Sequence, residues 1–174
     1  MSMNTKVCNP FKENFGDERV AICVTTNGIV MNNGKAVMGA GVAKFVRDNF
    51  DGVDEKLGKY LKQYGNRAFN LGPQEFEDNK FLLLSYPTKN HFKDKSDMNL
   101  IKESAQQISD IAEKLGVNKI FVPAPGCTNG QLEWSKVCKA IAPVFENSDK
   151  EFVITSLDKK TFSKHANYGN SFSP

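Results

Sequence analysis

Residue types that build metal centres and disulfide frameworks are scarce in this sequence. The 174 residues include four cysteines and two histidines, and no two cysteines form a CxxC pair. A structural zinc site usually needs such a pair, so none is expected. The HxxxH and HExxH patterns are also missing, which argues against a helical zinc motif. We therefore expect a protein without a metal and without a cofactor.

Long apolar runs and blocks of like charge are also missing. No stretch approaches the roughly 18 apolar residues of a membrane span, and the opening residues MSMNTKVCNPF contain no signal-peptide core. The net charge is only +3. These features predict a soluble, cytoplasmic protein with no membrane partner, and we expect a monomer. The length suits one domain, which we place at residues 1–158, followed by a C-terminal tail at residues 159–174.

Two common nucleotide-binding signatures are incomplete or absent. No GxxxxGK[ST] sequence exists, so the chain has no P-loop. The segment GAGVAK, residues 39–44, lacks the third glycine of a dinucleotide fingerprint. It also lacks the acidic residue that such a fingerprint places about 20 positions later.

Apolar, β-branched runs alternate with amphipathic patterns along the chain. Strands are predicted at residues 5–8, 20–26, 69–74, 81–87, 119–125 and 151–157. Helices are predicted at residues 41–50, 53–64, 97–115 and 132–145. This alternation favours parallel βαβ units, and continuous apolar runs such as VAICVTT suit strands that are covered on both faces.

Two glycine-rich loops each follow a predicted strand and precede a predicted helix. The first runs from residue 27 into GAGVAKF, and the second is PAPGCTNGQLEW, residues 123–134. Ligands of parallel sheets bind beyond the carboxyl ends of the strands, so both loops should meet there. Free N–H groups at helix starts favour anions, and a diphosphate would fit between the loops. Each loop taken alone could equally be a plain connection. Cys127 stands at the second helix start, but no base lies near it in the sequence to make it a nucleophile.

Together these segments resemble the macrodomain (ADP-ribose-binding) family. The strand ending in TTN, the turn-rich loop and MGAGVAK are similar to its first loop, and PGCTNGQLEW is similar to its second, phosphate-gripping loop. The resemblance is strongest to the branch with terminal ADP-ribose protein glycohydrolase and the small phage and bacterial macrodomains. It covers residues 5–158. It implies an α/β fold, a three-layer α/β/α sandwich with a mixed, largely parallel central sheet.

The resemblance also implies where ADP-ribose would bind. Asn27 would lie near the distal ribose, and Asn9 would accept a hydrogen bond from the adenine amino group where macrodomains usually place an aspartate. The remaining contacts would come from the two loops and the last strand: Met38, Gly39, Ala40, Gly41, Val42, Gly126, Cys127, Thr128, Asn129, Gly130, Ser156 and Leu157.

The residues implied for catalysis depart from the family pattern. The glycohydrolase has a catalytic aspartate in its second loop, where this sequence has Gly130. Its catalytic lysine would fall at Lys89, and Asn27 could orient a water molecule. Lys89 could equally be a solvated side chain.

Three functions therefore remain open. The first is an enzyme that hydrolyses ADP-ribosyl linkages or ADP-ribose 1''-phosphate, and the second is a non-catalytic module that reads or sequesters ADP-ribose. In both, the partner is ADP-ribose or an ADP-ribosylated substrate, and a nucleic acid enters only as such a substrate. The third is an RNA-binding domain, supported only by the basic stretch 89–95 with Phe92 inside it.

Overall fold

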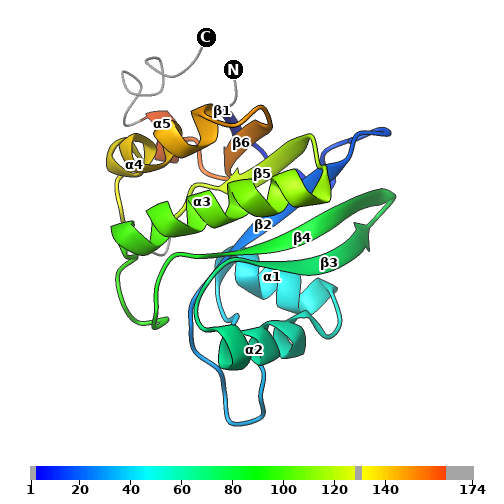
Figure 1. Cartoon of the computed structure of the whole chain (residues 1–174), viewed down its shortest axis with the longest axis vertical. Helices are drawn as coiled ribbons and strands as arrows, with labels where there is room; N and C mark the ends of the chain where they lie inside the picture. The colour runs from blue at the N-terminus through cyan, green and yellow to red at the C-terminus, as the bar shows by residue number, and fades with distance from the viewer. Residues whose placement is uncertain (1–2, 128–130, 164–174) are drawn as a thin grey trace.

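The architecture is a six-stranded sheet with helices on both faces (Figure 1). The computed structural model describes residues 3–127 and 131–163. The strands are β1 (Met3–Val7), β2 (Val20–Thr26), β3 (Phe69–Phe76), β4 (Asn79–Pro87), β5 (Lys119–Pro123) and β6 (Glu151–Ser156). The helices are the 3-10 helix η1 (Pro10–Lys12), α1 (Gly41–Asn49), α2 (Val53–Tyr64), α3 (Met98–Leu115), α4 (Trp134–Glu146) and α5 (Lys160–Ser163).

The sheet has the order β1-β6-β5-β2-β4-β3 and is parallel except at one end. β3 pairs antiparallel with β4, whereas the other four pairings are parallel. The predicted mixed, largely parallel sheet is confirmed. Because five strands point the same way, β1, β6, β5, β2 and β4 all end at one edge, which we call the carboxyl edge.

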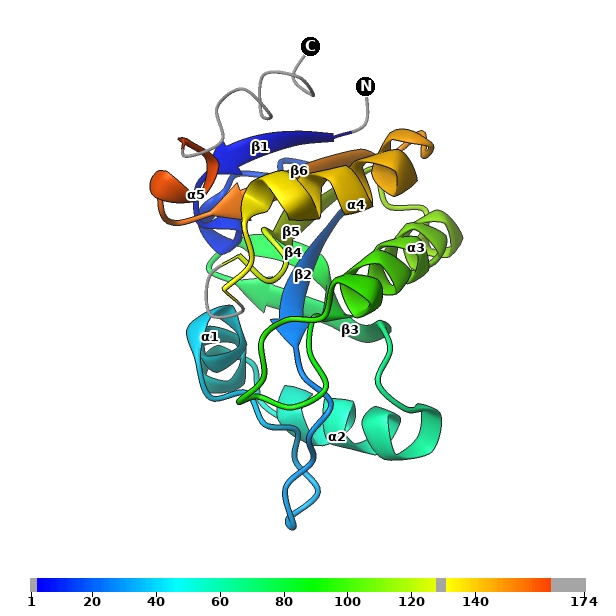
Figure 2. The same ribbon diagram turned by 90° about the vertical axis from the view of Figure 1, so that its left-hand side faces the viewer.

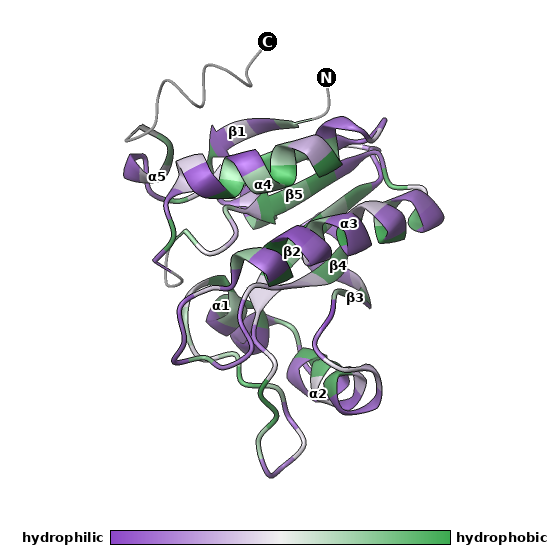
Figure 3. Ribbon diagram, turned by 60° about the vertical axis from the view of Figure 1, so that its left-hand side comes forward, coloured by the Kyte–Doolittle hydropathy of each residue, from purple (hydrophilic) through white to green (hydrophobic). Residues whose placement is uncertain are grey.

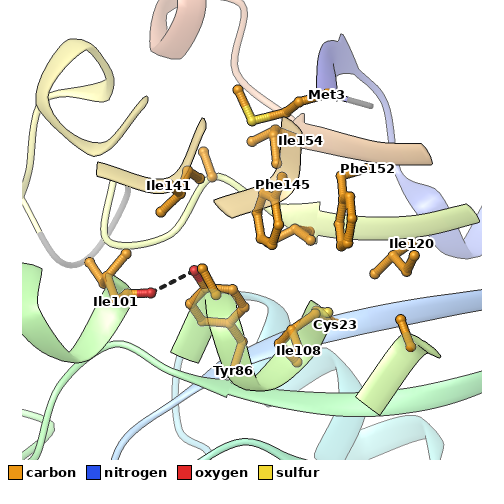
Figure 4. Close-up of a cluster of buried hydrophobic side chains, with 14 of the residues drawn as sticks. Met3, Cys23, Tyr86, Ile101, Ile108, Ile120, Ile141, Phe145, Phe152 and Ile154 are labelled. Atoms are coloured by element: carbon orange, nitrogen blue, oxygen red, sulfur yellow. Dashed lines mark hydrogen bonds between the residues drawn. The ribbon is translucent and has the colours of Figure 1, made fainter. Parts of the chain in front are cut away.

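Two separate cores account for the three layers. α3 and α4 cover one face, and α1 and α2 cover the other (Figure 1). The helices turn their apolar sides to the sheet and their polar sides outward (Figure 3). On the first face the buried Tyr86 hydroxyl donates to the carbonyl of Ile101 at 2.8 Å, which pins α3 to β4 (Figure 4). Phe145 and Phe152 stack with ring centroids 4.1 Å apart, joining α4 to β6.

The long connection between β2 and α1 is braced by α2. It projects past α2 at the lower end of the molecule (Figure 2). The amide of Ala36 donates to the carbonyl of Asp54 at 2.9 Å. Gly58 in α2 lies so close to this connection that a Cβ there would come within 2.0 Å of the Gly34 carbonyl oxygen. Gly58 therefore permits a backbone contact that no other residue allows.

Two short helices were not predicted from the sequence. η1 begins after Asn9, and α5 follows β6. Phe162 of α5 packs edge-on against Trp134 at 5.4 Å. The proposed boundary at residue 158 stays a prediction, and residues 164–174 of the tail lie outside the described residues. No described helix combines the length and the apolar content that a membrane span requires.

Candidate functional site

The strand order places the candidate residues in a row along the carboxyl edge. Asn9 follows β1, Ser156 ends β6, and Gly126 follows β5. Asn27 follows β2, and Lys89 follows β4. An elongated ligand lying along this edge would meet these residues in that order.

At the β1–β6 end, the two polar side chains already hold local structure. The Asn9 Oδ1 atom accepts from the amide of Phe11 at 3.1 Å and so caps η1. The Ser156 Oγ atom lies 2.8 Å from Thr161 Oγ1 and accepts from the amide of Asp158 at 3.0 Å. The Asn9 amide group still carries N–H donors for a ligand. Beside them, Leu157 is 74% exposed, which leaves an apolar surface at this end of the row.

Asn27 closes the first loop. Its Nδ2 atom donates to the carbonyl of Val37 at 3.1 Å, and its Oδ1 atom accepts from the amide of Ile29 at 2.9 Å. The side chain of Met38 is buried in the core that α1 and α2 cover. The sequence predicted Asn27 as a ligand contact; the structure adds that its amide first fixes the shape of the loop.

The start of α1 is open to an anion. Ala40 is the N-cap residue and provides no side-chain cap, so the first N–H groups of the helix receive no side-chain acceptor. Gly39, Ala40 and Gly41 are exposed, and a Cβ at Gly39 would meet no atom within 4 Å. Gly41 has a φ of 57°, in the left-handed region that favours glycine. Val42, next in the helix, is half-buried.

The second loop is held tightly at both ends. Gly126 has a φ of 74°, and a Cβ there would lie 2.8 Å from Cβ of Ser96 and 2.9 Å from Cδ1 of Ile101. The amide of Leu132 donates back to the Gly126 carbonyl at 2.8 Å. The predicted contacts Thr128, Asn129 and Gly130 lie outside the described residues.

Cys127 and the helix that follows the second loop bear on catalysis and on anion binding. Burial raises the pKa of the Cys127 thiol to about 12, so the group is neutral at physiological pH and poorly suited to act as a nucleophile. α4 starts at Trp134, and its N-cap residue Glu133 also provides no side-chain cap.

At the β4 end, Asn66, which was not predicted from the sequence, joins the turn before β3 to the loop after β4. The Asn66 Nδ2 atom donates to the carbonyl of Lys89 at 3.1 Å and to Oδ1 of Asn90 at 2.9 Å. The amide of Gly28 donates to the Asn90 carbonyl at 3.0 Å. The Lys89 ammonium group lies 3.4 Å from the Phe92 carbonyl. Asn66 sits in a short turn between α2 and β3, and nothing in its local sequence marks it as part of this edge.

A cavity of about 370 Å³ lies at the opposite edge of the sheet. Its walls come from the residues before β2 and from the β3–β4 hairpin, including Asp17, Arg19 and Lys80. Neither of the glycine-rich loops and no uncapped helix start contributes to its walls. Among residues 3–127 and 131–163, no three His, Cys, Asp or Glu side chains are grouped to hold a metal ion.

Solved structures share this arrangement. The macrodomain of Mycobacterium tuberculosis DarG superposes with a TM-score of 0.68, covers 88% of this chain and 96% of its own, and is 21% identical. The macrodomain of Thermus aquaticus DarG gives a TM-score of 0.68 with the same coverage and 22% identity. This chain has the macrodomain fold. The predicted resemblance is confirmed.

The relatives found by sequence comparison match a smaller share of this chain than these two structures do. A DNA ADP-ribosyl transferase-DNA ADP-ribosyl glycohydrolase fusion protein of Thermosipho africanus is 34% identical over 84 residues, which is 48% of this chain. The chain spans only about a fifth of that relative's length, 20%. ADP-ribose glycohydrolase OARD1 of Homo sapiens is 28% identical over 120 residues, covering 69% of this chain and 74% of the relative. No model of a known protein family matches the chain.

Proposed function

We propose that this macrodomain binds ADP-ribose and hydrolyses ADP-ribosyl linkages. The observation that carries the proposal is the open start of α1, where Gly41 has a left-handed φ and no side chain caps the helix. It follows β2, and the glycine loop at Gly126 follows β5, the strand paired with β2. A diphosphate placed there would receive N–H groups from helix starts, which suit anions. Two relatives, from Thermosipho africanus and Homo sapiens, bear glycohydrolase names.

The positions of the adenine and the distal ribose follow from the order of the strands. With the diphosphate at the middle of the carboxyl edge, the adenine falls at the β1–β6 end, where Leu157 offers an apolar surface and Asn9 an amide. The distal ribose then falls at the β2–β4 end, beside the loops that carry Asn27 and Lys89.

The reaction requires little conventional acid–base chemistry. A water oxygen forms a bond to the anomeric carbon of the distal ribose, the bond from that carbon to the acceptor breaks, and the water proton passes to the departing acceptor. Holding the water and ribose in line supplies much of the rate. Lys89 lies at this end of the row, in the loop that follows β4. A non-catalytic reader is the alternative, because Gly130 replaces the aspartate of the glycohydrolase.

We further propose that the acceptor is a single-stranded nucleic acid. The loop beside the distal-ribose end carries Lys89, Lys93 and Lys95, and Phe92 is 43% exposed there. Phe92 stacks on His91 with ring centroids 4.3 Å apart. Positive charge with exposed aromatic rings suits the backbone and bases of a single strand. The Thermosipho africanus relative is named for DNA.

Calorimetric titration with ADP-ribose tests the binding proposal. We expect saturable binding of one ligand per chain, and no heat at millimolar ligand would overturn it. Chromatography after incubation with an ADP-ribosylated oligonucleotide, an ADP-ribosylated glutamate peptide and ADP-ribose 1''-phosphate tests the chemistry. Binding without product would select the reader, and product from the peptide alone would overturn the nucleic-acid acceptor. The monomer and the cytoplasmic location stay predictions; elution at the mass of one chain, 19.4 kDa, would support the first.

A further inference from the structure

We infer that Asn66 is a positioning residue that clamps the loops carrying Asn27 and Lys89 and so preforms the distal-ribose end of the site. The inference rests on the proposed function. Asn66 lies far from both residues in the sequence, in the turn between α2 and β3.

The clamp consists of three hydrogen bonds among three separate segments. Asn66 Nδ2 donates to the Lys89 carbonyl at 3.1 Å and to Asn90 Oδ1 at 2.9 Å. The amide of Gly28, which follows Asn27 directly, donates to the Asn90 carbonyl at 3.0 Å. The loop after β2 is thus tied to the loop after β4, and Asn66 holds the second loop in place.

Chemistry fixes the orientation of the Asn66 amide. The Lys89 carbonyl oxygen can only accept a hydrogen bond, so the Asn66 atom facing it must be the NH₂ group. The opposite atom, Oδ1, is then buried, and within the described part of the chain it has no hydrogen-bond partner. Burying such an oxygen is costly, so the two bonds made by Nδ2 have to offset that cost.

The groups around this clamp are tightly packed. A Cβ at Gly28 would lie 2.9 Å from Asn66 Nδ2 and 3.1 Å from the Asn90 carbonyl oxygen. A side chain at position 28 would therefore press on both the Asn66 amide and the Asn90 carbonyl. Above the clamp, the amide of Thr88 donates to the Thr26 carbonyl at 3.0 Å, which continues the pairing of β2 and β4 to the edge. These backbone bonds set the separation of Asn27 and Lys89, and Asn66 holds the loop after β4 in the position that the bonds require.

Comparing the binding of two ligands distinguishes this positioning role from a general effect on stability. ADP and ADP-ribose share the adenosine diphosphate, and only ADP-ribose reaches the clamped loops. If Asn66 positions those loops, its loss should weaken ADP-ribose binding and leave ADP binding unchanged. A merely structural role would weaken both ligands together.

Three variants disrupt the hydrogen bonds of the clamp to different degrees. Asn90→Asp keeps it, because the Asn66 NH₂ group can donate to a carboxylate. Asn66→Asp removes the donor to the Lys89 carbonyl without changing shape. The double variant Asn66→Asp/Asn90→Asp places two carboxylates about where the 2.9 Å hydrogen bond was.

Calorimetry with both ligands at pH 8 gives the readout. We expect Asn90→Asp to keep the wild-type preference for ADP-ribose over ADP. Asn66→Asp should reduce it roughly 5-fold, and the double variant 10-fold or more, with ADP affinity unchanged. The single variant serves if the double variant fails to fold. An unchanged preference in Asn66→Asp, parallel losses for ADP and ADP-ribose, or a wild type that binds the two equally would each overturn the inference. A wild type that binds neither ligand would instead overturn the proposed function.

Discussion

Replacing Gly58 by alanine should destabilise this protein, against the usual effect of that change in a helix. Gly58 lies in the middle of α2, where alanine is normally favoured over glycine by about 1 kcal/mol. Here the new Cβ would lie 2.0 Å from the Gly34 carbonyl oxygen, whereas real contacts stay above 3.0 Å. The connection or the helix must therefore move by roughly 1 Å, since these are backbone atoms without rotamer freedom.

The magnitude follows from three contributions. The helix propensity gains about 1 kcal/mol. Overpacking of this kind costs about 1–3 kcal/mol. Displacing the connection also breaks the hydrogen bond from the Ala36 amide to the Asp54 carbonyl, which is worth about 1 kcal/mol. The net expectation is a loss of about 1–3 kcal/mol in the free energy of unfolding.

Urea unfolding followed by circular dichroism measures this change. The matched control is the pair Lys59→Ala and Lys59→Gly at the exposed neighbouring position, which isolates the propensity difference in the same helix. We expect the alanine member of that pair to be the more stable by about 1 kcal/mol. If Gly58→Ala were also more stable than the wild type, the close contact between α2 and the first loop would be wrong.

Three further outcomes are expected. Gly41→Glu should abolish ADP-ribose binding in calorimetry because its carboxylate takes the place meant for phosphate; Gly16→Glu, with a similar φ of 61° and no atom within 4 Å, should retain it, and equal affinities would contradict the placement. Lys89→Ala should abolish hydrolysis measured by chromatography yet keep ADP-ribose affinity within a few-fold, and undiminished turnover would remove Lys89 from the chemistry. Burial raises the pKa of Cys127 to about 12 and that of Cys138 to about 11. The free energy of unfolding therefore keeps the contribution of these neutral buried thiols below the ordinary thiol pKa of 9.0, and loses it as the pH rises from there through the folded values. The urea midpoint should therefore fall by the equivalent of about 2 kcal/mol for each of the two thiols between pH 8 and pH 10.5, and a flat profile would count against buried neutral thiols.

The sheet could be predicted because its strands are covered on both faces. VAICVTT and FLLLSYP read as continuous apolar runs, and they became β2 and β4 within a residue or two. The antiparallel direction of β3 could not be predicted from its sequence, because FNLGPQ alternates only over its first three residues and the connection to β4 is not a strong hairpin sequence.

Only part of the candidate site could be predicted from the sequence. Glycines at a strand exit are a local signal, so the loops at Gly41 and Gly126 could be found directly. Asn66 could not, because its importance lies in bonds to residues more than 20 positions away. The capping role of Asn9 could have been predicted from the sequence. An asparagine before a proline is a typical helix start, and η1 begins there.

The neighbouring positions of β1 and β6 have a consequence for biosynthesis. β1 pairs only with β6 in the sheet, although nearly the whole described chain separates the two strands. During translation, the first strand must wait unpaired until the sixth has left the ribosome. The nucleobase end of the proposed cleft is therefore assembled last, and nucleotide binding would report that synthesis of the domain is complete.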